Sequence, residues 1–328
     1  GQGGSGDSGK PVQKAEKELA GSTRIGTAIA VAREAYPEGP KGVIIARSSD
    51  FPDALAASTL AGAKGYPILL NPSAGLDPEL RAYLRDSGSI SEAILIGDEN
   101  SLPRSMEAEI GKMVPSVSRI GGDDRFDTAR LLRDKSREAG AAAKTAVISR
   151  SDEFPDALSI SPYCAATGAL LYIVTPGSLL DKKALQELSG YDQVIIVGDS
   201  NAVSAKLEKS LKAVSKKVVR LAGGVGNSYP KTRYGTSQAI SSWLVTGANA
   251  GFSVDRASFA TGKKFPDALA GGPFCGKLRC PIVLVDTVDY TAIGSLASRG
   301  KTSGLYWLGS TDTLPLGLRG KIKKGLGY

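Results

Sequence analysis

The sequence predicts an α/β protein built from three tandem modules, each a small doubly wound parallel sheet of the Rossmann or flavodoxin type. Three observations predict this fold. The pentapeptide Phe-Pro-Asp-Ala-Leu occurs three times, a second motif precedes each copy, and a third motif follows each copy in the same order. Internal repeats have to be found before a fold is assigned, because each repeat is one structural unit.

The three motifs recur with a period of about 100 residues. The arginine and threonine of the first motif are Arg24 and Thr27, Arg125 and Thr128, and Arg233 and Thr236. The pentapeptides begin at Phe51, Phe154 and Phe265, and the third motif ends an apolar run at Gly97, Gly198 and Gly309. The third copy has seven extra residues within 224–232, which belong in a surface loop. The chain therefore divides into a flexible linker (1–11) and modules 12–115, 116–216 and 217–328.

Within the first module, helical and strand patterns alternate. Apolar residues at helical spacing predict a helix over 24–36, which Pro37 and Gly39 stop. The apolar run 43–46 suits a buried parallel strand. A second helix is expected to begin at Pro52, since proline is tolerated at the first helical position and Asp53 would face the positive end of the helix dipole. The remaining elements are a strand over 67–70, a helix over 77–86, a strand over 93–97, a helix over 102–112 and a chain segment 117–120 that leads into the next module.

Strands that alternate with helices in this way indicate βαβ units around a parallel sheet. The linkers between modules are short. We therefore expect the three modules to pack closely around a pseudo-threefold axis, with alanine-rich helices as contact faces.

Composition excludes several classes of function. The chain has no histidine, which removes Ser-His-Asp and Cys-His nucleophiles and histidine-ligated zinc. Cys164, Cys275 and Cys280 match no metal-site spacing and are interpreted as small core residues, with a Cys275–Cys280 bridge left open. No cofactor or metal is expected, no apolar run is long enough to span a membrane, and the few aromatic residues are not interleaved with basic ones as in nucleic-acid platforms.

Candidate site residues lie where the predicted strands end, because ligands bind beyond the carboxyl ends of strands in open α/β sheets. Asp53, Asp156 and Asp267 are either ligand or acid–base groups, or first-turn aspartates that satisfy helix amides. We favour the second interpretation. The whole set interpreted as structural is Phe51, Pro52, Asp53, Phe154, Pro155, Asp156, Phe265, Pro266 and Asp267, together with Thr27, Thr128 and Thr236 as hydroxyls bonded to nearby backbone.

Basic residues around the pentapeptides are the candidate ligand-binding groups. Arg24, Arg125 and Arg233 each open a helix, which is the unfavourable end for a cation. Each either forms an ion pair with a pentapeptide aspartate or clamps an anion, since the guanidinium fork suits both. The full candidate set is Arg24, Arg125, Arg233, Arg47, Arg150, Lys263 and Lys264. A net charge of +8 is compatible with an anionic partner.

These motifs resemble the cell wall-binding repeat 2 family. The likeness rests on the Arg-x-x-Thr start, the Phe-Pro-Asp-Ala-Leu centre, the following apolar strand and the Gly ending, and it extends from about Leu19 to the end. It implies a compact pseudo-trimer of three modules in a secreted protein of Gram-positive bacteria, located at the cell wall or cell surface. It also implies an effector domain in the full-length protein. The first copy departs from the pattern, because it lacks a good apolar strand before Leu19.

The resemblance and the residues together predict a non-enzymatic module that anchors a protein non-covalently to the wall. The expected partner is an anionic wall polysaccharide or teichoic-acid-like polymer, and nucleic acid is not expected. Two alternatives stay open. One is an enzyme that acts on wall glycan through carboxylates such as Asp53 or Asp156, and the other is a structural surface-layer or adhesion protein.

Overall fold

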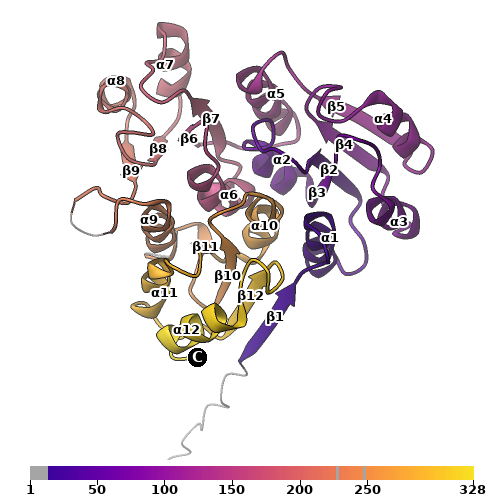
Figure 1. Ribbon diagram of the computed structural model, residues 1–328. Helices are drawn as coiled ribbons and strands as arrows, with labels where there is room; N and C mark the ends of the chain where they lie inside the picture. Colours follow the sequence, from indigo (N-terminus) through magenta and orange to yellow (C-terminus); the bar gives the residue numbers. More distant parts are fainter. Residues whose placement is uncertain (1–13, 227–228, 247–248) are drawn as a thin grey trace, which may run out of the picture.

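The structure is a computed structural model that describes residues 14–226, 229–246 and 249–328. The linker expected at 1–11 lies outside the described residues. The described part contains three separate sheets, each of four parallel strands flanked by helices (Figure 1). This confirms the predicted α/β class and its threefold repetition.

Each sheet has the same strand order. The first sheet contains β3 (Ile68–Asn71), β2 (Gly42–Arg47), β4 (Glu92–Ile96) and β5 (Ser116–Ile120), in that order. The second contains β7 (Leu170–Val174), β6 (Thr145–Arg150), β8 (Gln193–Val197) and β9 (Val218–Leu221). The third contains β11 (Ile282–Val285), β10 (Arg256–Thr261), β12 (Gly304–Leu308) and β1 (Ala15–Leu19).

The helices follow the repeat in the same way. α1, α5 and α9 carry the arginine motif, and α2, α6 and α10 follow the pentapeptide. Their bounds, with those of the other helices, are α1 (Arg24–Ala35), α2 (Ala57–Lys64), α3 (Pro78–Asp86), α4 (Arg104–Gly111), α5 (Arg125–Glu138), α6 (Pro155–Thr167), α7 (Lys182–Ser189), α8 (Ala205–Val214), α9 (Arg233–Val245), α10 (Pro266–Leu278), α11 (Gly294–Ala297) and α12 (Leu316–Leu326), with short 3-10 turns η1 (Asn249–Gly251) and η2 (Thr291–Ile293).

One predicted helix start is wrong. The helix expected from Pro52 begins at Ala57, although its counterparts α6 and α10 begin at the proline of their pentapeptides. In the first copy the chain makes turns instead: the N–H of Ala54 donates to the carbonyl of Phe51 and that of Ala57 to the carbonyl of Ala54. Proline at this position therefore permits a helix start but does not dictate it.

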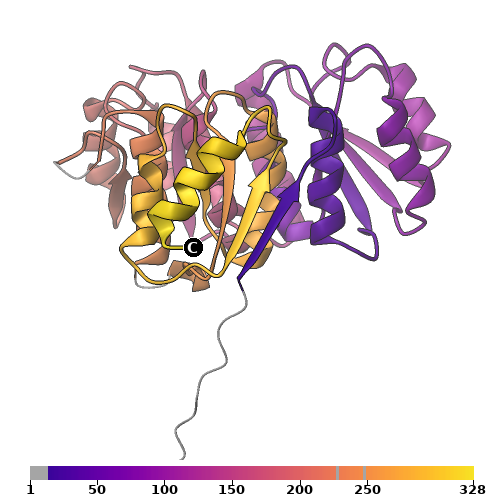
Figure 2. The ribbon, with the colours of Figure 1, turned by 60° about the horizontal axis from the view of Figure 1, so that its bottom comes forward.

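The sheets are offset by one strand from the sequence repeat. β5 belongs to the second predicted module (116–216) but completes the first sheet, and β9 belongs to the third (217–328) but completes the second. The third sheet takes its last strand from the other end of the chain. There β1 pairs in parallel with β12, from Ala15 opposite Gly304 to Leu19 opposite Leu308 (Figure 2). Each sheet is therefore shared by two copies of the repeat: the first and second, the second and third, and the third and first.

The three copies meet along helices α2, α6 and α10, which lie at the centre of the molecule (Figure 1). Small residues permit this close approach, as expected of the alanine-rich helices. A Cβ added at Gly62 would overlap the backbone of Ala165, and one at Gly272 would reach the hydroxyl of Ser161. One continuous core of buried residues contains side chains from all three copies.

The pentapeptide phenylalanines meet at one end of these helices. Ring centroids are 5.7 Å apart for Phe51 and Phe154, 5.8 Å for Phe51 and Phe265, and 6.3 Å for Phe154 and Phe265. All three pairs are edge to face, the arrangement that the ring quadrupole favours, with about 0.5–1.5 kcal/mol per pair beyond the buried area. The triplet defines the pseudo-threefold axis at the carboxyl ends of β2, β6 and β10.

The structure shows the state of the three cysteines and whether any described helix could cross a membrane. Cys164, Cys275 and Cys280 are free, buried thiols, so no Cys275–Cys280 bridge forms. None of the helices in the described ranges is long and apolar enough to cross a membrane.

The last strand of each sheet is fixed by a charged pair with a matching helix. In the first sheet Arg119 of β5 donates to the carbonyls of Gly97 and Leu102 and pairs with Glu107 of α4 at 3.0 Å. In the second sheet Arg220 of β9 repeats this pattern with Gly198, Val203 and Glu208.

The third sheet reverses the two charges. Its strand carries Glu18 and its helix carries Arg319, which pair at 2.7 Å. Arg319 donates to the carbonyls of Leu314 and Gly309, the counterparts of the carbonyls that the strand arginines hold in the other sheets. The third sheet therefore has the same ion pair between its last strand and the matching helix, but the acidic residue lies on the strand and the basic residue on the helix.

The equivalence of this pair to those of the other sheets can be tested by exchanging its two residues, so that the strand carries arginine and the helix carries glutamate. Glu18→Arg alone places two guanidinium groups together and should lower the free energy of unfolding by about 1–3 kcal/mol. The double variant Glu18→Arg/Arg319→Glu should recover more than half of that loss, because the guanidinium introduced on β1 could then hold the same carbonyls. Urea unfolding of both singles and the double gives the coupling energy. Strictly additive effects would contradict the proposed equivalence.

Candidate functional site

Two open pockets lie at the carboxyl ends of the strands, where the sequence placed its candidate residues. The second-sheet pocket has a volume of about 260 Å³ and is lined by Arg150, Glu153, Pro155, Asp156, Asp199, Asn201, Ala202, Gly223, Lys231, Thr232, Arg233 and Thr236. The third-sheet pocket, of about 160 Å³, is lined by Gly21, Ser22, Thr23, Arg24, Thr27, Lys264, Pro266, Asp267, Ser310, Asp312 and Thr313.

Both pockets form between two copies of the repeat. In the second-sheet pocket, the pentapeptide residue Asp156 comes from the second copy and Arg233 from the third. In the third-sheet pocket, Asp267 comes from the third copy and Arg24 from the first. The sequence expected the two motifs to converge at one edge of the same module, whereas Arg233 and Arg24 share their pockets with the pentapeptide of another copy.

Local structure fixes the turn that carries each arginine. The side chains of Thr23, Asp124 and Thr232 cap α1, α5 and α9 by accepting from an amide three residues later. The motif threonines bond back to the same turns: Thr27 accepts from the amide of Gly21, Thr128 from Gly122 and Thr236 from Gly223, at 3.0–3.1 Å. The capped turn and the first helical turn therefore form one rigid unit.

The arginines hold the loop in front of the pentapeptide. Nη1 of Arg24 donates to the carbonyl of Ser48 at 2.6 Å, that of Arg125 to Ser151 at 2.7 Å, and that of Arg233 to Gly262 at 2.7 Å. This bond explains why a cation is kept at the unfavourable end of three helices, a reason that neither sequence-based alternative had included.

Two of these arginines also reach across to the preceding copy. The guanidinium of Arg24 lies over the ring of Phe265 at 5.8 Å, and that of Arg233 lies over Phe154 at 5.5 Å. Arg233 approaches Glu153 at 3.9 Å. Among the described residues none of the three lies within 4.0 Å of a pentapeptide carboxylate, so the expected direct ion pair is not formed. Arg24 and Arg233 also line the pockets.

Asp156 and Asp267 do not make the bonds to helix amides that the favoured interpretation expected. Neither accepts a hydrogen bond from a helix amide in the described structure, and α6 and α10 have no side-chain cap. Both are buried, with 8% and 7% of their surface exposed, and both line a pocket. Neither carboxylate is among the fully buried polar atoms that lack a partner, so its oxygens reach the pocket space, where a water molecule or a ligand hydroxyl can donate.

Burial also changes the acidity of these two groups. Burial raises the pKa of Asp156 to about 6, although the charges of Arg150 and Arg233 oppose the change. Burial likewise raises the pKa of Asp267 to about 6, against the charges of Arg24 and Lys264. Such shifts cluster at functional sites, because a site that binds polar ligands keeps groups poorly solvated in their absence.

Asp53 has a different environment. The hydroxyl of Ser101 donates to its Oδ2 at 3.3 Å. The matching residue in the second copy is Ala202, which has no donor. In the third copy it is Thr313, whose hydroxyl donates to the carbonyl of Ser310 instead. The first copy therefore satisfies its aspartate internally, and the other two do not.

The glycine of the third motif is required by these aspartates. Gly97, Gly198 and Gly309 have φ of 105°, 104° and 119°, a region that favours glycine. A Cβ at these positions would lie 3.0, 2.6 and 2.6 Å from Oδ2 of the pentapeptide aspartate of the same copy. The third motif is thus kept because the aspartate packs directly against its backbone.

The other predicted basic residues divide into two groups. Arg150 and Lys264 line the pockets. Arg150 also holds Asp152 through two bonds of 2.7 and 2.9 Å. Arg47 pairs with Asp50 at 3.5 Å, and Lys263 is absent from both sets of lining residues.

Sequence reasoning missed part of each lining. Asp199, Asn201, Asp312 and Thr313 follow the glycine of the third motif, and Lys231 lies in the extra loop of the third copy. The segment after the third-motif glycine was expected at the same sheet edge as the pentapeptide, because it follows a strand, but Asp199 and Asp312 were not selected as candidate residues.

The pockets suit binding of a polar ligand that carries an acidic group. Each combines cations with carboxylates, so guanidinium and ammonium groups can hold an acidic substituent while the carboxylates accept from hydroxyls. The described residues contain no group of three or more cysteine, aspartate or glutamate side chains that could hold a metal ion.

Comparison with known proteins gives a consistent result. The model of a family described as cell wall binding domain 2 matches residues 18–107, 119–208 and 229–317. N-acetylmuramoyl-L-alanine amidase LytC of Bacillus subtilis (strain 168) is 23% identical over 309 residues, which cover 94% of this chain and 58% of that protein. The amidase enhancer of the same organism is 27% identical over 297 residues, or 90% of this chain and 38% of that protein.

Two solved structures share the fold. Cwp8 from Clostridium difficile matches with a TM-score of 0.82 and 26% identity over 95% of this chain and 52% of that chain. Cwp6 from Clostridium difficile matches with a TM-score of 0.83 and 21% identity over 96% and 48%. The chain thus spans about half the length of the relatives that it matches.

The buried carboxylates predict a specific dependence of stability on pH. The folded protein binds protons at Asp156 and Asp267 more tightly than the unfolded chain, so their contribution is fully present below about pH 4 and is lost as the pH rises through about 6. Relative to the parent, Asp156→Asn/Asp267→Asn should therefore gain about 2–5 kcal/mol of unfolding free energy between pH 4 and pH 7.5. Urea unfolding at both pH values measures this change. A difference between variant and parent that stays constant with pH would contradict it.

Proposed function

Because the chain belongs to the cell wall binding domain 2 family, we propose that it attaches a secreted protein non-covalently to the bacterial cell wall by binding an anionic wall polymer. The family description and the amidase relative of Bacillus subtilis support a place at the wall. The observation that carries the proposal is the pair of inter-copy pockets, in which a buried carboxylate without a protein donor faces arginine and lysine side chains.

The pocket chemistry favours an acidic sugar unit over a simple anion. In the second-sheet pocket Arg150, Lys231 and Arg233 are balanced by Glu153, Asp156 and Asp199. A bare phosphate would meet three carboxylates there. A sugar ring instead offers hydroxyl donors to the carboxylates, while an acidic substituent takes the cations. The polymer is therefore proposed to be a polysaccharide or a sugar-bearing, teichoic-acid-like chain.

The proposed ligand contacts are assigned by position. Arg24 and Lys264 serve the third-sheet pocket, and Arg150 and Arg233 serve the second-sheet pocket. Arg125 is the repeat counterpart of Arg24 and Arg233, and Arg47 is the counterpart of Arg150. Lys263 precedes Lys264 on the same loop and is proposed to contact polymer that extends beyond the pocket.

We further propose that two of the three copies of this site bind ligand. Asp156 and Asp267 accept no hydrogen bond from another described residue, whereas Asp53 accepts one from the hydroxyl of Ser101. Two sites on one rigid body would hold successive units of the same chain, and their effective concentration would raise the overall affinity well above that of either site.

Hydrolysis of wall glycan is the second candidate function. Asp156 has a raised pKa, and the charge of Asp199 in the same pocket contributes to it. An acid facing a second carboxylate is the arrangement that glycosidases use. Binding is preferred because the family that matches the chain is described by binding. Release of reducing ends from purified wall by the parent, and its loss in Asp156→Asn, would support catalysis.

Wall association can be measured by pelleting the protein with purified Gram-positive walls. Lys231→Ala/Lys264→Ala removes one lysine from each pocket and should weaken association about 3–30-fold, because two charge-assisted contacts are lost. Lys206→Ala/Lys209→Ala, on α8, removes the same charge outside the pockets and should change association less than about twofold. Failure of the parent protein to pellet with walls would overturn the proposed function.

The number of ligand-binding sites can be tested by adding one hydroxyl group beside Asp156. Ala202→Ser places in the second copy the donor that Ser101 gives to the first, so Asp156 would be satisfied internally. Titration of the parent with a short wall-polymer oligomer should give two sites per chain, and the variant should give one. Three sites in the parent, or an unchanged number in the variant, would contradict the assignment.

A further inference from the structure

The two ends of the sheets carry opposite charge. The strands of each sheet are parallel, and β2, β6 and β10 all end at the phenylalanine triplet. The carboxyl ends of the three sheets therefore face one side of the molecule, and their amino ends face the other. Segments that lead from a strand to a helix lie on the first side, and segments that lead into a strand lie on the second.

The connecting segments on the carboxyl-end side are acidic, although the helix starts and strand ends beside them carry Arg24, Arg150 and Arg233. In the described segments that lead from a strand to the next helix, fourteen residues are acidic and three are basic. Asp98 and Asp199 show the cause, because each accepts from backbone amides of its own turn. Helix starts and tight turns favour aspartate for the same reason.

The amino-end side is basic. In the described segments that lead into a strand, nine residues are basic and three are acidic. We call this side the amino-end face. Its cations serve all three sheets and include Lys41, Lys112, Lys144, Lys217, Arg279 and Lys301.

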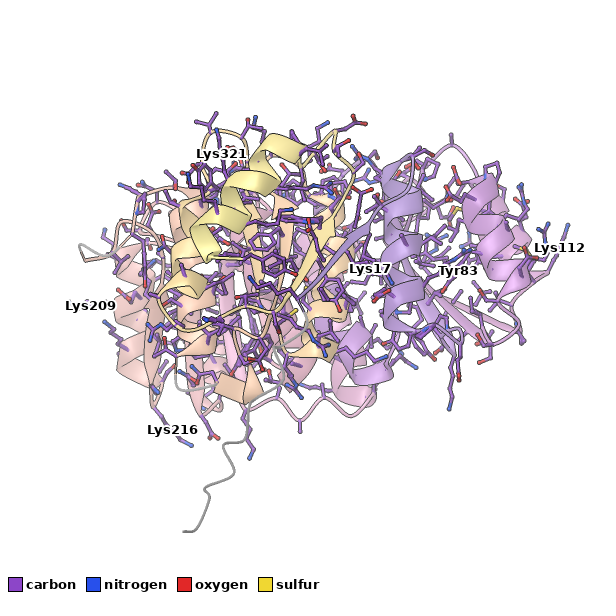
Figure 3. All side chains as sticks on the ribbon, turned by 90° about the horizontal axis from the view of Figure 1, so that it is seen from below. Lys17, Tyr83, Lys112, Lys209, Lys216 and Lys321 are labelled. Carbon is purple, nitrogen blue, oxygen red and sulfur yellow. The ribbon has the colours of Figure 1, made fainter. Side chains whose placement is uncertain are left out.

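These cations are available for binding. All nine are exposed, and Lys112 and Lys216 project away from the body of the protein in Figure 3. Among them, Lys216 is the one with a carboxylate within 4.0 Å in the described structure, at 3.7 Å from Asp192. Lys14, Arg279 and Arg299 donate to neutral protein oxygens, which leave their charges in place. Exposed like charges repel one another, and that repulsion is relieved when a polyanion binds.

We propose that the amino-end face is a second contact surface, which captures an extended polyanionic chain by charge. This proposal rests on the proposed function and adds a surface to it. The pockets select a sugar unit at the opposite side, where the surrounding field is acidic and a polyanion gains little from long-range attraction. The amino-end face supplies that attraction, so salt should weaken it more than it weakens the pockets.

The same observations argue against a membrane as the partner. Membrane surfaces are bound by apolar side chains together with cations. Of the six large apolar side chains that are exposed in the described structure, Val214 lies toward the amino-end face. The other five, Phe126, Leu179, Val225, Val288 and Leu316, lie at carboxyl ends.

The proposal can be tested by replacing one lysine at the amino end of each sheet with glutamate. Lys112→Glu/Lys217→Glu/Lys301→Glu reverses one charge at the amino end of each sheet. The matched control Lys182→Glu/Lys183→Glu/Lys209→Glu makes the same change in net charge on α7 and α8. Binding of long-chain polyphosphate at low salt, and of purified walls, should fall about tenfold or more in the first variant and less than about twofold in the control. Thermal unfolding of each variant confirms that it is folded.

Each outcome distinguishes the two proposals. If the parent binds walls and both triple variants bind polyphosphate alike, net charge alone acts and the amino-end face is overturned, while the proposed function stands. If the parent does not bind walls, the proposed function fails. Binding of inorganic phosphate as tightly as polyphosphate would contradict an extended ligand. Lysine-dependent binding to phosphatidylglycerol vesicles, with none to polyphosphate, would replace the polymer by a membrane.

Discussion

Three phenylalanine rings, one from each repeat, meet edge to face at the pseudo-threefold axis, and most of the molecule is arranged by that contact. Because each ring belongs to the loop after a central strand, the contact brings the carboxyl ends of three sheets together. It also places the second and third pentapeptides beside an arginine of another copy, because the guanidinium groups of Arg233 and Arg24 lie over the rings of Phe154 and Phe265. The phenylalanine therefore serves the fold, while in the second and third copies the aspartate two residues later lines a pocket.

The strand offset makes the trimer depend on both ends of the chain. The first two sheets are completed by a strand of the next copy, and the third sheet is completed by β1 of the first copy. The reversed Glu18–Arg319 pair shows how the substitute strand is held: the polar contacts of the junction are kept, although the residues that make them have changed sides. A chain without β1 would leave the edge of β12 open to pairing with another strand.

The sequence was sufficient for the fold class and the threefold repetition, because the pentapeptide and its flanking motifs recur in the same order. It was not sufficient for the strand offset. Residues 15–19 are mostly exposed on an edge strand and lack the apolar run by which a buried strand is recognised. A signal did exist, since Glu18 and Arg319 occupy the positions that Arg119 and Glu107 occupy in the first sheet. The burial of Asp156 and Asp267 could not be predicted either, because it depends on contact with a copy that is distant in sequence.

The charge of the two sides follows from the same local rules that build the helices. Caps and turns at helix starts favour aspartate, so the carboxyl ends of the strands become acidic whatever the protein binds. An anionic ligand at that side needs cations that are fixed in place. Arg24 and Arg233 meet this need, because the carbonyl bonds of Nη1 hold each guanidinium beside a pocket. The cost of placing a cation at a helix start is thus offset by loop contacts, while the segments that lead into strands have no cap to favour aspartate and carry more basic than acidic residues.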